Sequence, residues 1–201
     1  MRTVKLYDTT LRDGSQAEGI SYSVMDKIRI AEELDKIGIH FIEGGWPGSN
    51  PKDREFFEKI TRSKLKNSKI AAFSMTRRPN IPASQDSNLL ALLKSGAQVI
   101  TIVGKTWDFH VTEVLKTTLT ENLKMIADEI DFLVKKGFEV FYDAEHFFDG
   151  YKANPKYAIE TLKAAEKGGA SHLVLCDTNG GTLPTEVVQI IHKLGKEIKL
   201  K

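Results

Sequence analysis

The 201-residue chain has an ordinary globular composition, with 41% hydrophobic and 28% charged residues. Its net charge of +2 gives no basis for nucleic-acid or membrane-surface binding. The single cysteine, Cys176, excludes an internal disulfide framework and is typical of a reducing cytosol. We therefore expect a cytoplasmic protein without a membrane span. No signal peptide is evident, because Met1–Lys5 runs directly into a predicted strand.

Short apolar segments recur along the chain at intervals of about 30–40 residues, the length of one βα unit. Four of them follow a lysine and a glycine, a combination typical of helix C-termini. The predicted strands are residues 3–7, 39–43, 69–74, 99–103, 139–143 and 172–176.

The segments between these strands predict amphipathic helices with recognisable starts. Ser23, with Asp26 three residues later, has the pattern of a capping box. Asn50–Pro51 and Asn154–Pro155 each place a capping residue before a proline in the first helical position. Apolar strands that alternate with amphipathic helices predict a parallel sheet covered by helices.

Two α/β architectures fit this alternation, an open doubly wound sheet and a (β/α)₈ TIM barrel. The segment Arg12–Gln16, after the first strand, does not resemble the Gly-x-Gly-x-x-Gly of a dinucleotide-binding sheet. Polar residues at successive strand ends favour the catalytic face of a barrel. These residues are Asp13, Glu43, Ser74, Lys105, Glu145 and Asp177.

Eight units at this spacing would need about 250–280 residues, a length typical of the TIM barrel. The chain contains six, and residues 196–201 resemble the opening of a seventh strand. We therefore expect residues 1–201 to be an incomplete TIM-barrel catalytic domain. The last two βα units and any C-terminal regulatory domain would lie outside it.

Charged residues follow the first two predicted strands. Arg12 and Asp13 lie just past the first strand, and Glu43 ends the second. Parallel neighbours bring their carboxyl ends to the same edge, so we expect a site that suits a metal and an anionic oxygen ligand. The structural alternatives are an ion pair between Arg12 and Glu43, and a turn in which Asp13 only caps Gly14.

Four parts of the sequence resemble the metal-dependent acyl-CoA enzymes that have TIM-barrel folds: Asp8–Gly14 (Asp-Thr-Thr-Leu-Arg-Asp-Gly), Glu43, Glu145 and Cys176–Gly180. That family includes isopropylmalate, homocitrate and citramalate synthases and hydroxymethylglutaryl-CoA lyase. The segment Glu43–Asp53 is most similar to the citramalate synthases. The resemblance implies an acyltransferase of amino-acid biosynthesis that condenses acetyl-CoA with a 2-oxo acid. In the citramalate branch, which leads to isoleucine, that acid is pyruvate.

Several alternatives remain open. They are 2-isopropylmalate or homocitrate synthase, a lyase or aldolase of the same superfamily, and an inactive fragment completed by a partner. The resemblance implies a homodimer for the full-length protein.

The resemblance also implies a role for each site residue. Asp13 would be a ligand for Mg²⁺ or Mn²⁺, with Zn²⁺ accepted by related sites. Arg12 would bind the substrate and stabilise oxyanion charge, and Glu43 would hold its guanidinium. Glu145 would bind the keto acid or handle the acetyl methyl proton, and Thr178 would hydrogen-bond the substrate carboxylate. The family's remaining metal ligands are a His-x-His pair, which this sequence lacks and which we expect beyond residue 201.

Near Glu145 lie three other candidates for the functional acid or base: Asp143, His146 and Asp149. We favour Glu145 because it falls where the family motif has its acid, and we interpret His146 as a rim or core histidine. Cys176, in an apolar strand, is predicted to be an inert core thiol. Lys105 could bind an acyl-CoA phosphate or simply be solvated.

Overall fold

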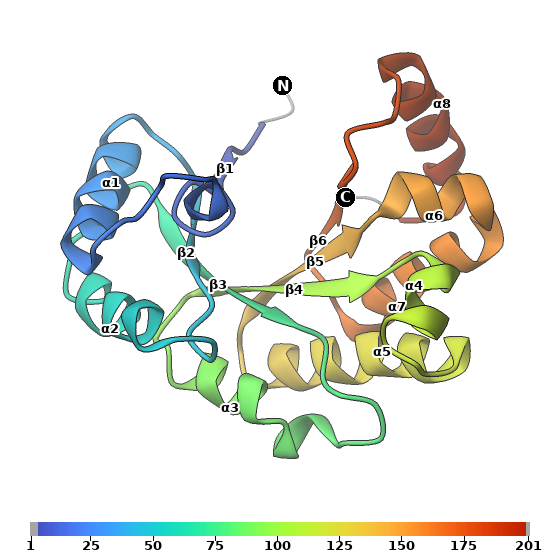
Figure 1. Cartoon of the computed structure of the whole chain (residues 1–201), viewed down its shortest axis with the longest axis horizontal. Helices are drawn as coiled ribbons and strands as arrows, with labels where there is room; N and C mark the ends of the chain where they lie inside the picture. The colour runs from blue at the N-terminus through green and yellow to red at the C-terminus, as the bar shows by residue number, and fades with distance from the viewer. Residues whose placement is uncertain (1–3, 200–201) are drawn as a thin grey trace. The chain divides into compact units, whose positions relative to one another are not determined.

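The computed structural model describes residues 4–199. Strands and helices alternate along this part of the chain (Figure 1). The strands are β1 (Tyr7–Asp8), β2 (Phe41–Gly45), β3 (Lys69–Met75), β4 (Val99–Lys105), β5 (Glu139–Glu145) and β6 (His172–Leu175). The α-helices are α1 (Val24–Lys36), α2 (Pro51–Ile60), α3 (Ser87–Leu93), α4 (Asp108–Glu113), α5 (Leu119–Lys135), α6 (Phe147–Ala153), α7 (Pro155–Gly168) and α8 (Pro184–Leu194). Two 3₁₀ turns, η1 (Gly14–Gln16) and η2 (Ala83–Gln85), complete the set.

The strands hydrogen-bond to one another in sequence order, from β1 to β6. The pairs β1–β2, β2–β3 and β5–β6 are parallel. A doubly wound sheet reverses its strand order at a switch point, whereas a TIM barrel adds each strand beside the preceding one. The order therefore confirms the predicted fold class, six βα units of the TIM-barrel type.

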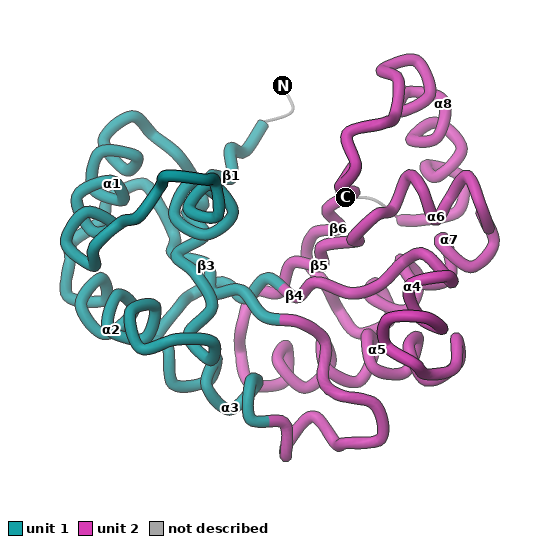
Figure 2. Tube along the Cα trace, viewed as in Figure 1, with its two compact units in different colours: residues 1–74, 87–101 teal, residues 75–86, 102–201 magenta. Residues whose placement is uncertain are grey.

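The chain divides into two compact units (Figure 2). Unit 1 comprises residues 1–74 and 87–101, and unit 2 comprises residues 75–86 and 102–201. In unit 1, β2 is buried along its whole length, as expected for a strand covered on both faces. Its core includes Phe41, Ile42, Phe56 and Phe57, which are almost completely buried. Burying a large apolar side chain contributes about 1.5–3 kcal/mol, so these four residues together stabilise the unit substantially.

In unit 2, α5 and α7 pack against each other and against β5. The first of these helices turns an apolar stripe inward, with Ile126, Ile130 and Leu133 fully buried. The capping motifs are also confirmed. Ser23 forms a capping box with Asp26, and both predicted asparagines cap helices that begin with proline.

Three local expectations need correction. The first strand is Tyr7–Asp8 rather than residues 3–7, and Val4 and Leu6 are exposed; residue 3 lies outside the described residues. Cys176 follows β6 and is only half-buried, so it is not a core thiol. Residues 196–198 form a turn and a bend rather than a strand, because their amides bond back to Lys193 and Leu194. Residues 200–201 lie outside the described chain.

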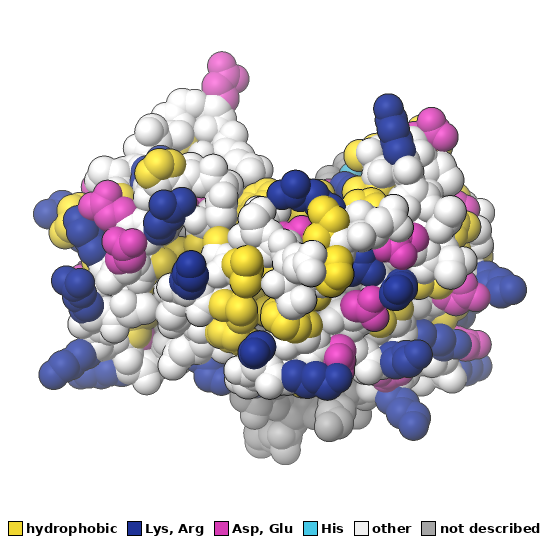
Figure 3. All heavy atoms as spheres, turned by 90° about the horizontal axis from the view of Figure 1, so that it is seen from below, with side chains coloured by type: hydrophobic (Ala, Val, Ile, Leu, Met, Phe, Trp, Pro, Cys, Tyr) yellow, Lys and Arg dark blue, Asp and Glu magenta, His cyan; other side chains and the backbone are white. Residues whose placement is uncertain are grey.

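None of the described helices combines the length and the apolar character that crossing a bilayer requires. On the face of the described chain shown in Figure 3, cationic and anionic side chains are interspersed. This pattern agrees with the near-neutral net charge.

Candidate functional site

The turn after β1 is built by the motif that the sequence singles out. The amides of Arg12 and Gly14 both donate to the Thr9 carbonyl, each at 3.1 Å. The Asp8 carboxylate accepts hydrogen bonds from the amide (3.0 Å) and the hydroxyl (3.1 Å) of Thr10. Short polar side chains thus fix the loop locally, which is the reason for Asp and Thr at these positions.

Arg12 is held on three sides within unit 1. Its Nε donates to Glu43 Oε1, and its guanidinium lies over the Phe73 ring with Cζ 4.0 Å from the centroid. Its Nη1 is 3.3 Å from Asp13 Oδ1. The structure therefore joins the three charged residues predicted to form a site. Their exposure differs, because the Glu43 side chain is fully buried whereas that of Asp13 is 63% exposed.

Glu43 has a second partner that the sequence did not indicate. The Tyr7 hydroxyl donates to Glu43 Oε2 at 2.5 Å and lies 2.6 Å from Thr101 Oγ1. Burial raises the pKa of the Glu43 carboxyl, while the charge of Arg12 and the Tyr7 hydrogen bond act against that rise. Both carboxylate oxygens are thus engaged, which fixes the plane in which Arg12 is held.

The loop after β2 is fastened by a buried ion pair. Lys27 Nζ is 2.6 Å from Asp53 Oδ1, and the other carboxylate oxygen accepts the Trp46 amide at 2.9 Å. Gly45 has φ of +135°, and a Cβ there would come within 2.6 Å of the Asp53 carboxylate. Glycine is therefore required for this close approach. Burial lowers the pKa of Lys27, partly offset by Asp53. This arrangement explains the Gly-Gly-Trp segment that follows Glu43.

Asp13 offers one hard oxygen donor to a divalent cation, since only its Oδ1 pairs with Arg12. Among residues 4–199 there is no group of three or more His, Cys, Asp or Glu side chains arranged to hold a metal ion. Asp13 can therefore contribute a carboxylate to a cation site, but the described residues do not make a site of three or more such ligands.

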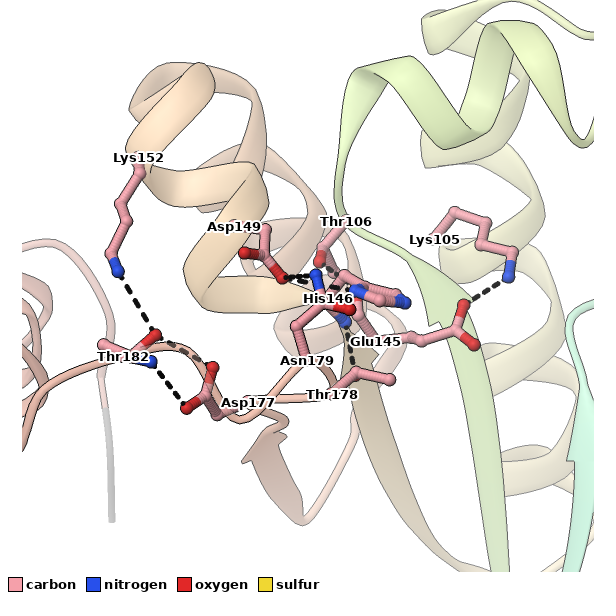
Figure 4. A network of polar contacts seen from close by, with 10 residues as sticks. All are labelled: Lys105, Thr106, Glu145, His146, Asp149, Lys152, Asp177, Thr178, Asn179 and Thr182. Carbon is pink, nitrogen blue, oxygen red and sulfur yellow. Dashed lines mark hydrogen bonds and ion pairs between the residues drawn. The ribbon is translucent and has the colours of Figure 1, made fainter.

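In unit 2 the ends of β4 and β5 are joined by polar contacts (Figure 4). Lys105, the last residue of β4, forms an ion pair with Glu145, the last residue of β5. The next residue, Thr106, donates its hydroxyl to the Glu145 carbonyl at 2.5 Å. Lys105 is therefore the partner of the predicted acid rather than a solvated lysine.

His146 adopts the left-handed conformation, with φ 51° and ψ 35°, where α6 begins. Its amide donates to Thr178 Oγ1 at 2.9 Å, and its ring Nδ1 is 3.2 Å from Asp149 Oδ2. Asn179 Nδ2 donates to the same carboxylate oxygen at 2.9 Å. The structure thus brings Thr178 next to the residue that follows Glu145 and joins their loops.

The remaining polar residue after β6 has a structural role. Asp177 accepts hydrogen bonds from the amide (3.0 Å) and the hydroxyl (2.8 Å) of Thr182. These bonds brace the turn at Gly180, where φ is +64°. Asp177 therefore supports the loop that carries Thr178.

His110, on α4, completes the unit 2 cluster. Its ring lies edge-on to that of His146 at a centroid distance of 4.6 Å and 4.9 Å from Trp107. Its Nδ1 is buried and has no hydrogen-bond partner among the described residues. Burial lowers the pKa of His110, with the neighbouring charges of His146 and Lys105 adding to the effect. The sequence alone gave no signal for this contact, because the two histidines are far apart in the chain.

These features define a class, an α/β-barrel domain with charged side chains at the carboxyl ends of its strands. The HMGL-like family profile matches residues 3–201, and the chain therefore belongs to the HMGL-like family.

The curated relatives agree with this assignment, and a structural neighbour shares the fold. The chain is 61% identical over 198 residues to the (R)-citramalate synthase of Geobacter sulfurreducens, covering 98% of this chain and 38% of the relative. It is 32% identical over 199 residues to the 2-isopropylmalate synthase of Listeria innocua, covering 99% and 37%. The HMG-CoA lyase structure from Bacillus subtilis has a TM-score of 0.78 at 20% identity, covering 98% of this chain and 65% of that one. That likeness shows the fold. The chain spans less than two-fifths of the length of these synthases.

Proposed function

We propose that this chain is the N-terminal part of the catalytic barrel of a citramalate synthase. The reaction is the condensation of acetyl-CoA with pyruvate, followed by thioester hydrolysis, which gives citramalate and free CoA. The observation that carries the proposal is the contrast in identity, 61% with a citramalate synthase against 32% with an isopropylmalate synthase. The Arg12–Glu43 pair beside Asp13 supports the chemistry.

The chain's own residues take the following parts. Arg12, held by Glu43, binds the 2-oxo acid and offers its fork of N–H donors to the developing alkoxide. Thr178 accepts a hydrogen bond from the His146 amide, which leaves its own O–H to donate to the substrate carboxylate. Glu145, paired with Lys105, helps to position the 2-oxo acid.

Asp13 is proposed as a ligand of Mg²⁺, Mn²⁺ or Zn²⁺, in keeping with its single available carboxylate oxygen. When bound, such a cation supplies Lewis-acid polarisation of the ketone. The remaining ligands are proposed to be a His-x-His pair further along the full-length protein. We further propose that this protein is a cytoplasmic homodimer with a C-terminal regulatory region.

The test is pyruvate-dependent release of CoA from acetyl-CoA by the purified full-length protein with Mn²⁺, followed with a thiol reagent. Parallel reactions contain 2-oxoisovalerate or 2-oxoglutarate, and mass spectrometry identifies the product. Citramalate formation with pyruvate as the preferred acid is expected. Preference for 2-oxoisovalerate would instead assign an isopropylmalate synthase, and cleavage of hydroxymethylglutaryl-CoA without condensation would assign a lyase.

A further inference from the structure

His146 has a backbone conformation that is uncommon for a residue other than glycine. Its φ of 51° places it in the left-handed region, at the junction between β5 and α6. Such conformations persist only where the surroundings impose them, and they concentrate at functional sites. Here the Thr178 hydroxyl accepts the His146 amide, and α6 begins directly afterwards. The position of the ring is therefore set by two strand ends.

The ring is oriented by a chain of hydrogen bonds. Asp149 Oδ2 is 3.2 Å from Nδ1 of His146 and 2.9 Å from the side-chain amide of Asn179 (Figure 4). A carboxylate can only accept, so Nδ1 carries the proton and the lone pair of the neutral imidazole is at Nε2. Asn179 in turn fixes the carboxylate. A histidine whose Nδ1–H is held by a carboxylate is a recurring arrangement for proton transfer at Nε2.

The competing base is less available. Glu145 Oε2 already accepts the ammonium group of Lys105, so that oxygen must give up an ion pair before it can take a proton. His146, by contrast, is engaged by Asp149 through Nδ1. The His146 side chain is 16% exposed, which leaves it open to a small reacting group.

A carboxylate and a second imidazole flank the His146 ring. The titratable groups in contact with the ring are Asp149 on its own helix and His110 on α4; Lys105 and Glu145, at the strand ends, act electrostatically on that neighbouring His110. Burial and the neighbouring charges of His146 and Lys105 lower the pKa of His110, which disfavours a second positive charge beside His146. Asp149 stabilises the imidazolium once it forms.

We propose that His146, oriented by Asp149, is the base that removes the acetyl methyl proton. The inference rests on the proposed function. The methyl C–H bond breaks, its proton goes to Nε2, its electron pair forms the carbon–carbon double bond of the enolate, and the π electrons of the thioester carbonyl move to oxygen. The enolate carbon then bonds to the ketone carbon of the 2-oxo acid as the thioester carbonyl re-forms, and the ketone π electrons move to oxygen. The alkoxide takes a proton from solvent water, and His146 returns its proton to solvent. Water hydrolyses the thioester and releases CoA.

The deciding variant is His146→Asn in the full-length protein. Asparagine tolerates the left-handed conformation better than most residues but cannot act as the base. We expect kcat to fall by about 10²–10⁴, with the KM for pyruvate little changed. Acetyl-CoA with a trideuterated methyl group should give a larger primary isotope effect than with the unchanged protein, because proton removal becomes rate-limiting.

Asp149→Asn is the second variant, and it acts through His146. Its amide can donate to Nδ1 and so favours the wrong tautomer, which should lower kcat in the same direction. The double variant should be no slower than His146→Asn alone, because the two residues act as a unit. If His146→Asn lowers the melting temperature, Asp149→Asn decides the question. His192→Asn, at an exposed position on α8, is the matched control and should leave kcat unchanged.

The outcomes separate the two proposals. An active parent protein whose His146→Asn variant keeps kcat within about tenfold and shows no increase in isotope effect overturns the role of His146. Glu145→Gln, assayed in parallel, then identifies the base. A parent protein that releases no CoA with any 2-oxo acid overturns the proposed function and, with it, this inference.

Discussion

At the residue scale, the geometry around Arg12 is the most specific feature of unit 1. Glu43 and Asp13 take different nitrogens of the guanidinium, and Phe73 lies against its face. Tyr7 fixes the far oxygen of Glu43. A planar fork held in this way is preorganised for a developing oxyanion, which a flexible ammonium group is not.

Arg12→Lys should therefore lower kcat of the full-length enzyme by about 10²–10³, the typical cost of losing one oxyanion donor. Glu43→Gln should give a milder defect, because it loosens the guanidinium without removing it. The measurement is pyruvate-dependent CoA release at saturating Mn²⁺. If Arg12→Lys raises only KM, the charge-stabilising role is wrong and Arg12 is a substrate-binding residue or a structural ion pair.

Asp13→Ala should differ from both of these variants, because it should weaken Mn²⁺ affinity and pyruvate binding together.

A second residue, Glu129 on α5, is fully buried, and only one of its two carboxylate oxygens has a hydrogen-bond partner among the described residues. Its Oε2 accepts the Arg77 amide, whereas Oε1 has no partner among the described residues. Burial raises the pKa of Glu129 well above its usual value, and the nearby Asp86 adds to the rise. The native state therefore holds a proton that the unfolded chain releases as the pH rises. Stability falls with increasing pH between the two pKa values.

Glu129→Gln should remove this penalty. Below the ordinary carboxyl pKa both proteins are uncharged at this position, so their stabilities should be similar. As the pH rises, the variant should become the more stable, by about 1.4 kcal/mol for each unit by which the native pKa is raised. Hydrogen exchange of the α5 amides, compared at about pH 4 and about pH 8, measures the difference. Equal protection of the two proteins at both pH values would show that Glu129 is ionised at no cost.

The sequence could predict Arg12, Asp13 and Glu43 as neighbours because two consecutive parallel strands must end at the same edge. It could not predict Tyr7 or the Lys105–Glu145 pair, because these depend on which way side chains point across non-local pairings. The burial of Cys176 was predicted wrongly for a related reason. Its apolar strand indicated burial, but β6 is half-exposed along most of its length.

At the scale of elements, α6 is seated by a close backbone approach. A Cβ at Gly150 would lie 2.8 Å from the Thr106 carbonyl oxygen and 2.9 Å from the Cα of Trp107. No side chain can yield there, because both neighbours are backbone. The helix that carries Asp149 is therefore positioned directly by the end of β4.

Gly150→Ala should push α6 away from β4 and lower the melting temperature by several degrees, as expected for overpacking that costs about 1–3 kcal/mol. Because Asp149 and His146 move with the helix, kcat should fall as well. Gly181→Ala is the matched control, since a Cβ there would have open space. A Gly150→Ala protein with unchanged melting and activity would show that this contact does not position the helix.

The sequence predicted the boundaries of elements correctly where a capping residue marks the start of a helix. Ser23, Asn50 and Asn154 marked helix starts correctly, because a capping bond depends only on residues within one turn. The first strand was placed wrongly because β-rich composition does not reveal where a neighbouring strand is available. Among the described residues before the turn, Tyr7 and Asp8 are in register with β2, and Leu6 adds a single carbonyl that accepts the Phe41 amide.

At the scale of the whole molecule, residues 1–201 expressed alone should aggregate and bind Mn²⁺ more weakly than the full-length protein. An apolar groove of about 460 Å³ lies among residues of β6, α7 and α8, and Leu183 and Val188 are more than half exposed. Open apolar surface beside a half-exposed strand favours association. Light scattering and calorimetric Mn²⁺ titration test this. Monomeric protein that melts cooperatively and binds Mn²⁺ with micromolar affinity would contradict both expectations.

The pairing of strands in chain order also bears on synthesis at the ribosome. Each strand pairs with the one made just before it, so its partner has already left the exit tunnel when it emerges. At about 5–20 residues per second, a new βα unit appears every few seconds. Unit 1 is the exception, because residues 87–101 rejoin it only after residues 75–86 have been added to the chain. The last segment of unit 1 is therefore synthesised after residues of unit 2, and a nascent chain that stops before residue 101 lacks part of the residues that unit 1 needs to fold.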